Sequence, residues 1–291
     1  DTGILCSGQK KLKREEVIFR CEKLIRSINS KNLKDTILVV GTEVPFAGGG
    51  DHLKTNVTKL ENIKKEFRMY KVLFNKYNSL KNKSFCLVID PGMAFGNESI
   101  TKSKLKNFIK KSDFSKKNNF VFEAHSSDYQ SLKDLKKLNS LNFKFLKVGP
   151  ELTFYYLKAA LYMEDIEKKK FKKNSNLRKV ISTRMNINKK YWKQYYKENK
   201  KKNEYLKFNS YLDRARYYWR EKDVNTSKKI LFKNIDNMNL DTFSTSFKLT
   251  KDDFKIKKIL SLNNSNFIVY KFLKKTLEKY YLACNYKLNS N

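Results

Sequence analysis

Two residues capable of acid–base chemistry stand close together near the middle of the chain, in the stretch FEAHSSDYQ (122–130). Glu123 and His125 are separated by one alanine, so in an extended strand both side chains project from the same face. A carboxylate beside an imidazole suits proton transfer, and His125 is also a candidate metal ligand. A histidine held only by hydrogen bonds in a loop is the alternative that involves no chemistry.

A second candidate, Lys147, ends the next apolar stretch, LKVGPELT (146–153). Burial of a charged group in an apolar run costs free energy unless the group is paired or hydrated. Lys147 therefore suggests a phosphate contact or a Schiff base. A lysine that points outward from a strand end is the alternative. Gly149 stands before a predicted helix, whose free amide groups suit an anion. Ser126 and Ser127 could also bind phosphate, or could cap the helix predicted to begin near Tyr129.

A glycine-rich stretch, VVGTEVPFAGGGDHL (39–53), follows an earlier apolar run. Its glycines predict a mobile loop, and Glu43, at the end of the run, is its best candidate for function. Asp51 and His52 follow these glycines, so the stretch could also hold a metal.

These candidates need elements that bring them together. Four short runs rich in Val, Ile and Phe predict buried strands, at 36–43, 84–92, 119–126 and 143–150. Helical patterns alternate with them, at 12–29, 58–80, 101–111 and 129–139. This alternation predicts a parallel sheet, in which Glu43, Asp90, His125 and Lys147 meet at the carboxyl ends of the strands. From about residue 151 onward the pattern is helical, which predicts an α/β domain over 1–165 and a helical extension over 166–291.

The charge of the chain is strongly positive, with 64 Lys and Arg against 29 Asp and Glu and a net charge of +35. Such a charge suggests a nucleic-acid or membrane partner. Only nine of the 64 are arginines, however, and the lysines are spread over nearly every predicted helix, which favours a solvated surface. The stretch DRARYYW (213–219) interleaves arginine with tyrosine, and we interpret it as a helix packed by its aromatic side chains.

The four cysteines show no paired spacing, which indicates reduced thiols in a cytoplasmic protein. No apolar run in the sequence approaches the length of a membrane span.

Six motifs together resemble one family. They are GTEVPFAGG (41–49), DPGMAFGNE (90–98), FEAHSSDYQ (122–130), LKVGPELTF (146–154), YWKQYY (191–196) and DRARYYW (213–219). Their order is similar to that of the accessory subunits of tagatose-bisphosphate aldolase, the GatZ/KbaZ type. The opening DTGILCSG resembles the family's motif at the end of barrel strand four. By this order Asp51 and His52 align with the family's glycines after GTEVP, so the resemblance implies that the pair is a coincidence in a loop.

The resemblance implies a class II aldolase-like (β/α)8 TIM barrel, here partial (strands four to eight), with a C-terminal helical extension. It also implies a non-catalytic accessory role beside a separate catalytic subunit that holds zinc, in the cleavage of a sugar bisphosphate in galactitol or amino-sugar catabolism. We therefore expect no cofactor in this chain, no nucleic acid or membrane as a partner, and self-association as an open alternative. A stand-alone metal-dependent sugar-phosphate lyase and a basic nucleic-acid-binding protein are the alternative functions.

Several departures from the family pattern bear on the site. Ala94 stands where the family has a glutamate, and SFKLT (246–250) lacks the family's glutamine, so we expect weak metal binding. If Asp1 marks the end of strand four, three strands are absent, and the sheet needs a complementing segment or chain to cover its edges.

Overall fold

The computed structural model describes residues 13–28, 36–41, 57–102 and 105–284. Their contacts divide the chain into two compact units. The first comprises the described residues within Asp1–Phe95, Ile100–Val148 and Tyr280–Asn291, and the second comprises Gly96–Ser99 and Gly149–Lys279.

A parallel sheet forms the centre of the first unit. Its strands are β1 (Val39–Val40), β2 (Cys86–Ile89), β5 (Val121–Ala124) and β6 (Phe143–Leu146), in the order β1-β2-β5-β6. All three pairings are parallel, as the sequence predicts, although each strand is shorter than its apolar run. The carboxyl ends of these strands therefore lie along one edge of the sheet.

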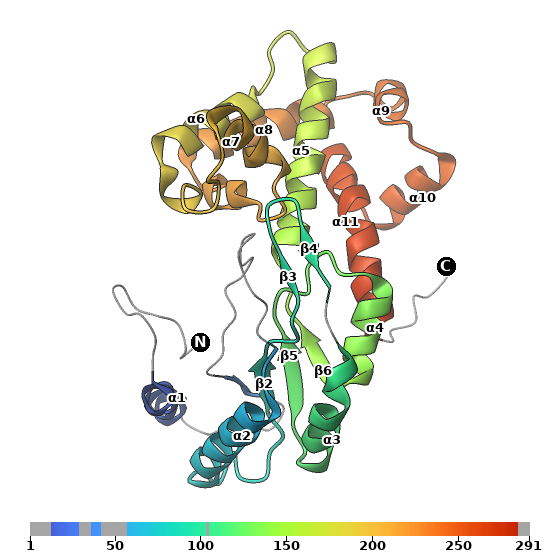
Figure 1. Ribbon diagram of the computed structural model, residues 1–291. Coiled ribbons are helices and arrows are strands. Elements are labelled where there is room, and N and C mark those ends of the chain that lie inside the picture. The colour runs from blue at the N-terminus through green and yellow to red at the C-terminus, as the bar shows by residue number, and fades with distance from the viewer. Residues whose placement is uncertain (1–12, 29–35, 42–56, 103–104, 285–291) are drawn as a thin grey trace. The chain divides into compact units, whose positions relative to one another are not determined.

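The helices of this unit alternate with its strands. They are α1 (Arg14–Ser27), α2 (Leu60–Asn75), the short 3-10 helix η1 (Leu105–Phe108), α3 (Ile109–Lys117) and α4 (Leu132–Ser140). Figure 1 shows them around the sheet that they connect. Buried side chains of α2, η1 and α4, among them Tyr70, Phe108 and Leu138, form one apolar core with Leu87 and Phe122 of the strands.

Successive side chains of a strand lie on opposite faces of the sheet, which determines which of them face away from this core. Leu87 and Ile89 of β2, like Phe122 and Ala124 of β5, belong to the core shared with the helices. Because successive side chains in a strand point to opposite faces, Glu123 lies on the other face of the sheet. The same alternation brings His125, just beyond β5, to the face of Glu123.

A two-stranded hairpin interrupts the predicted pattern after β2. Strands β3 (Ala94–Phe95) and β4 (Ile100–Thr101) pair antiparallel. The helix expected over 101–111 is therefore displaced, since residues 100–101 are extended and regular α-helix begins only at Ile109. Strands of two residues give too little periodicity to be recognised in a sequence.

The predicted barrel is not confirmed. The described part of the first unit contains a row of four parallel strands, of which β1 and β6 are the edges. The motif expected at the end of barrel strand four, at 1–8, lies outside the described residues. Closure of the sheet therefore stays a prediction from the family resemblance.

The second unit is helical in its described residues, as expected for the chain after residue 151. Its helices are α5 (Pro150–Lys170), α6 (Leu177–Ile187), α7 (Lys200–Asn209), α8 (Lys222–Asp236), α9 (Leu240–Phe247), α10 (Lys251–Ile259) and most of α11 (Asn264–Ala283), with the 3-10 helices η2 (Lys189–Tyr191) and η3 (Arg214–Tyr218). Leu157, Ile181, Tyr218 and Leu231 lie in its core. The contacts divide the chain between residues 148 and 149, just before α5 begins, and α5 is continuous across residue 165. The domain ranges 1–165 and 166–291 stay a prediction.

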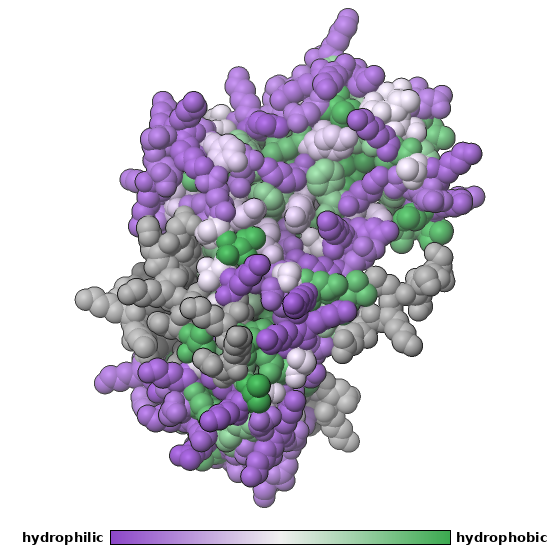
Figure 2. Space-filling view, turned by 45° about the vertical axis from the view of Figure 1, so that its right-hand side comes forward, coloured by the Kyte–Doolittle hydropathy of each residue, from purple (hydrophilic) through white to green (hydrophobic). Residues whose placement is uncertain are grey.

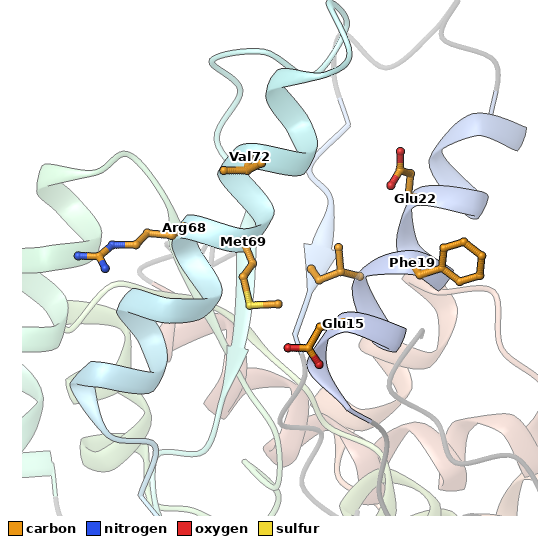
Figure 3. A pocket seen from close by; sticks show the side chains of 7 residues that line it. Glu15, Phe19, Glu22, Arg68, Met69 and Val72 are labelled. Carbon is orange, nitrogen blue, oxygen red and sulfur yellow. The ribbon is translucent and has the colours of Figure 1, made fainter.

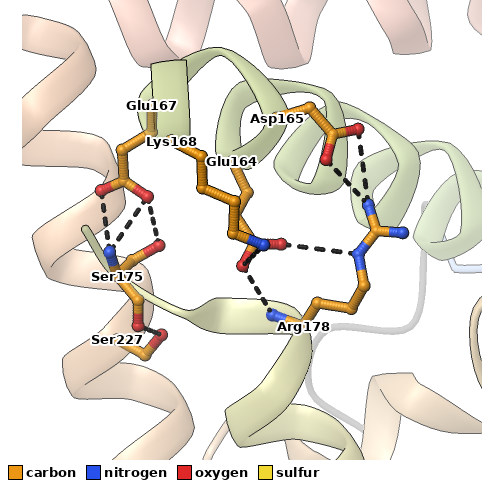
Figure 4. Close-up of polar contacts among 7 residues, drawn as sticks. All are labelled: Glu164, Asp165, Glu167, Lys168, Ser175, Arg178 and Ser227. Atoms are coloured by element: carbon orange, nitrogen blue, oxygen red, sulfur yellow. Dashed lines mark hydrogen bonds and ion pairs between the residues drawn. The ribbon is translucent and has the colours of Figure 1, made fainter. Parts of the chain in front are cut away.

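Two buried glutamates of α5 hold the segment that joins α5 to α6 (Figure 4). Glu167 accepts hydrogen bonds from the backbone N–H of Ser175, 3.0 Å away, and from its hydroxyl, 2.6 Å away. Asn234 of α8 donates a third, at 2.7 Å. Glu164 accepts from the backbone N–H of Arg178 and pairs with Lys168 at 3.0 Å. These carboxylates are compensated charges, which fits a structural role.

Much of the face seen in Figure 2 is hydrophilic, as the purple atoms show. No described helix is both long and apolar enough to cross a membrane.

Among the described cysteines, Cys21, Cys86 and Cys284 are free thiols.

Candidate functional site

The candidate site begins where β5 and β6 end. His125 follows the last residue of β5, and Lys147 follows the last residue of β6. The two strands are parallel neighbours, so these residues emerge side by side at the carboxyl edge, where α/β folds place their functional groups. The backbone N–H of Lys147 also donates to the carbonyl of Ala124 at 3.0 Å, which extends the pairing as far as His125.

Glu123 and His125 form a direct pair. The distance between His125 Nε2 and Glu123 Oε1 is 2.7 Å, and His125 is buried, with 5% of its surface exposed. A carboxylate can only accept, so Nε2 carries the proton and donates it to Glu123. In the neutral ring Nδ1 is then the unprotonated nitrogen and the basic atom of the pair.

Lys147 approaches the same ring nitrogen. Its Nζ lies 3.4 Å from His125 Nε2. One Nε2 cannot donate to Glu123 and accept from Lys147 at once, and the shorter distance, with a charged acceptor, favours the bond to Glu123. The Lys147 ammonium group is therefore held near the ring without a strong bond to it. Since Lys147 is exposed, this charge is available to an anion.

This arrangement suits a metal poorly. The nearby Lys147 ammonium group would repel a metal cation on His125, and with Nε2 protonated only Nδ1 could serve as a ligand. The described residues include no group of three or more His, Cys, Asp or Glu side chains that could hold a metal. Ala94, the departure from the family pattern, lies in β3, and weak metal binding stays a prediction.

The loop after β5 carries the candidate phosphate-binding serines. Ser126 is buried and has a positive φ of 57°, a conformation that costs non-glycine residues free energy. Ser127 is fully buried, and its hydroxyl donates to the carbonyl of Lys147 at 2.7 Å. In this structure the Ser127 hydroxyl therefore joins two strand ends. A contact of either serine with phosphate stays a prediction.

Gly149 stands directly before α5, whose first residue is Pro150. A Cβ added to Gly149 would meet no atom within 4 Å, so there is open space beside its backbone. The amide groups of the first turn of α5 suit an anion, as the sequence suggests. Phosphate binding at Gly149 stays a prediction.

Asp90 directly follows β2 at this edge of the sheet, as expected, and its carboxylate organises a turn. Its Oδ1 accepts from the backbone N–H of Gly92 at 2.7 Å, and its backbone N–H donates to the hydroxyl of Thr58 at 2.8 Å. Gly92 has a positive φ of 80°, which this tight turn requires. These contacts fix the entry to β3.

Comparison with known proteins shows the family to which this chain belongs. A family model described as "D-tagatose-1,6-bisphosphate aldolase subunit GatZ/KbaZ-like" matches residues 1–285. The chain belongs to this family. Among solved structures, one titled as a probable tagatose 6 phosphate kinase from Sinorhizobium meliloti 1021 is similar, with a TM-score of 0.77 and 23% sequence identity. The match covers 97% of this chain and 71% of that one, and at this identity it shows a shared fold.

Glu43, the candidate from the first family motif, lies outside the described residues, as do Asp51 and His52. Gly41, which opens the same motif, is described. A Cβ on Gly41 would come within 2.9 Å of the Cβ of Val88 in β2. The GatZ/KbaZ-like motif thus begins with a glycine that lets two strands approach closely.

The family motif DRARYYW is packed into the second unit. The guanidinium group of Arg214 stacks 3.9 Å from the ring of Tyr195 and 4.5 Å from that of Tyr217. Burial raises the pKa of Asp213 to about 6, against the opposing effects of Thr153 and the charges of Arg216 and Arg214. This agrees with the interpretation of the motif as packing, although η3 is a 3-10 helix.

A surface groove lies elsewhere in this GatZ/KbaZ-like chain, between α1 and α2 (Figure 3). Its lining combines apolar side chains with a few charges: Glu15, Ile18, Phe19, Glu22, Arg68, Met69 and Val72. In Figure 3 Met69 points toward α1, whereas Arg68 points away from it. None of the described site candidates, such as His125 and Lys147, lines this groove, so the groove is separate from the described ends of β5 and β6.

One contact of the site could not be found by motif. Tyr280, in the last turn of α11, donates its hydroxyl proton to the carbonyl of Ser127 at 2.9 Å. The two residues are 153 positions apart, and no pattern in the sequence joins them.

Proposed function

We propose that this chain is an accessory subunit of a D-tagatose-1,6-bisphosphate aldolase, which supports a separate class II catalytic subunit. The observation that carries this proposal is the family match over residues 1–285. The site agrees with it, because Glu123, His125 and Lys147 supply an oriented imidazole and a cation but a poor metal site.

We assign the zinc to the catalytic partner, where it would polarise the substrate carbonyl as a Lewis acid. In this chain the exposed ammonium group of Lys147 attracts an anion such as a sugar phosphate. Glu123 orients the ring of His125, so that Nδ1 is the atom available to a ligand.

A kinase function has less support. The similar solved structure is titled as a probable tagatose 6 phosphate kinase, but its 23% identity supports only the fold. The sequence of this chain contains no GxxxxGK[ST] phosphate loop. We therefore do not transfer that activity.

The test compares three samples in the presence of Zn²⁺: this chain alone, a class II catalytic subunit alone, and the two mixed. Cleavage of tagatose 1,6-bisphosphate is measured in each. We expect no cleavage by this chain alone and faster or longer-lasting cleavage in the mixture than by the catalytic subunit alone. Cleavage by the isolated chain would contradict the proposal and support the stand-alone lyase.

A control excludes simple protein stabilisation. Albumin at the same concentration should not reproduce the effect of the chain.

Retention of the chain on a DNA column at increasing salt concentration tests the nucleic-acid alternative, since binding through phosphates weakens steeply with salt. We expect only weak retention, because the lysines are not gathered on one described element.

A further inference from the structure

The loop that follows β5 holds a strained backbone beside the candidate site. Ser126 and Tyr129 both have positive φ, at 57° and 62°. Such conformations persist where the surrounding structure enforces them, and they are concentrated at functional sites. Contacts from outside the loop must therefore maintain its shape.

One of these contacts reaches the loop from the C-terminal helix. The Tyr280 hydroxyl donates to the carbonyl of Ser127 at 2.9 Å, and the Ser127 hydroxyl donates to the carbonyl of Lys147 at 2.7 Å. The two bonds form a chain of three residues that are far apart in sequence. It ends on the backbone of the residue whose ammonium group lies 3.4 Å from His125.

We propose that Tyr280 is a positioning residue for the His125–Lys147 pair, acting through Ser127. Its role rests on the proposed function of that pair. Both bonds use Ser127, so fixing its carbonyl also limits the direction in which its hydroxyl points. That hydroxyl fixes the backbone of Lys147, and the long side chain of Lys147 starts from there.

The last turn of α11 is well suited to this task. The ring of Tyr280 packs against the core of the first unit, and Ala283 is fully buried in it. Asn139 of α4 donates to the carbonyl of Ala283 at 3.0 Å. The turn is thus anchored by packing and by a second hydrogen bond, and Tyr280→Phe removes the hydroxyl while the ring remains.

The test uses the full chain and the side-chain nitrogen spectrum of its histidines, of which there are only two. His125→Gln assigns the signals. We expect Tyr280→Phe and Ser127→Ala to shift and broaden the His125 signals. Amides of residues 125–130 should exchange about fivefold faster, as expected for one lost hydrogen bond. Tyr281→Phe, at the exposed neighbouring position, is the matched control and should change neither.

A double-mutant cycle separates positioning from general loosening. If Tyr280 acts through Lys147, Tyr280→Phe should leave the His125 signals nearly unchanged in a Lys147→Met background. Equal shifts in both backgrounds, or unchanged His125 signals in a folded Tyr280→Phe protein, would overturn the proposal. These readouts do not depend on aldolase activity, so they stand apart from the test of the proposed function.

Discussion

His125 Nε2 lies 2.7 Å from Glu123 Oε1, and the two residues are next-but-one neighbours at the end of β5. The strand itself brings them together, because residues two apart share a face. The carboxylate fixes which ring nitrogen carries the proton, and Lys147 approaches that same nitrogen.

Removal of the carboxylate should move this proton. In Glu123→Ala, Nε2 loses its acceptor and becomes free to accept from Lys147 Nζ, so the proton shifts toward Nδ1. Nitrogen NMR of the labelled histidines measures the change in tautomer. Glu61→Ala, an exposed glutamate of α2, is the control and should leave the His125 spectrum as it is. An unchanged His125 tautomer in Glu123→Ala would contradict the assignment.

The stability of the protein should depend on pH through Asp213. Its pKa is raised by burial from 3.8 to about 6, so the folded state holds the proton more tightly than the unfolded state. The associated stability is present in full below about pH 4 and is lost as the pH rises toward 6, by on the order of 3 kcal/mol.

Asp213→Asn should therefore stabilise the protein at pH 7 and flatten its stability between pH 4 and 6. Denaturant unfolding at several pH values measures this difference. The matched control is Asp241→Asn, at an exposed aspartate of α9. A loss of stability in Asp213→Asn at pH 7 would mean that the charged carboxylate is stabilised by Thr153 and the neighbouring arginines more than burial penalises it.

The buried carboxylate of Glu167 should be important for the second unit. It accepts from Ser175 and Asn234, and Glu167→Leu would leave these donors without their acceptor. We expect a loss of about 2–4 kcal/mol in the free energy of unfolding. Asp165→Leu, whose carboxylate is half-exposed in an ion pair with Arg178, should cost less than about 1 kcal/mol. Similar losses in both variants would argue against the network.

The contact of β1 with β2 should not tolerate a side chain at Gly41. A Cβ there would lie 2.9 Å from Val88 Cβ and 3.2 Å from the Val88 carbonyl oxygen. Gly41→Ala should push the strands apart and destabilise the protein by about 1–3 kcal/mol. Gly149→Ala meets open space and is the comparison. Thermal melting of the two variants distinguishes them, and equal melting temperatures would be the contrary result.

The sequence predicted the parallel strands because each lies in a run rich in Val, Ile or Phe, and β2 is buried along its whole length. The runs around Val88 and Phe122 therefore stand out, and their order along the chain matches their order in the sheet. Period-two alternation likewise predicted that Glu123 and His125 share a face. The β3–β4 hairpin was missed, since two residues per strand carry no period.

Long-range contacts were beyond sequence reasoning. The hydrogen bond from Tyr280 to Ser127 joins positions 153 residues apart that share no motif.

The most direct test of the accessory role is a titration. A fixed amount of the class II catalytic subunit, loaded with zinc, receives increasing amounts of this chain, and the initial rate of tagatose 1,6-bisphosphate cleavage is measured. The account predicts a rate that rises and saturates at a fixed ratio of the two chains, with no cleavage when the catalytic subunit is omitted. A rate that does not respond to this chain, or that grows in proportion to it without the catalytic subunit, would contradict the account.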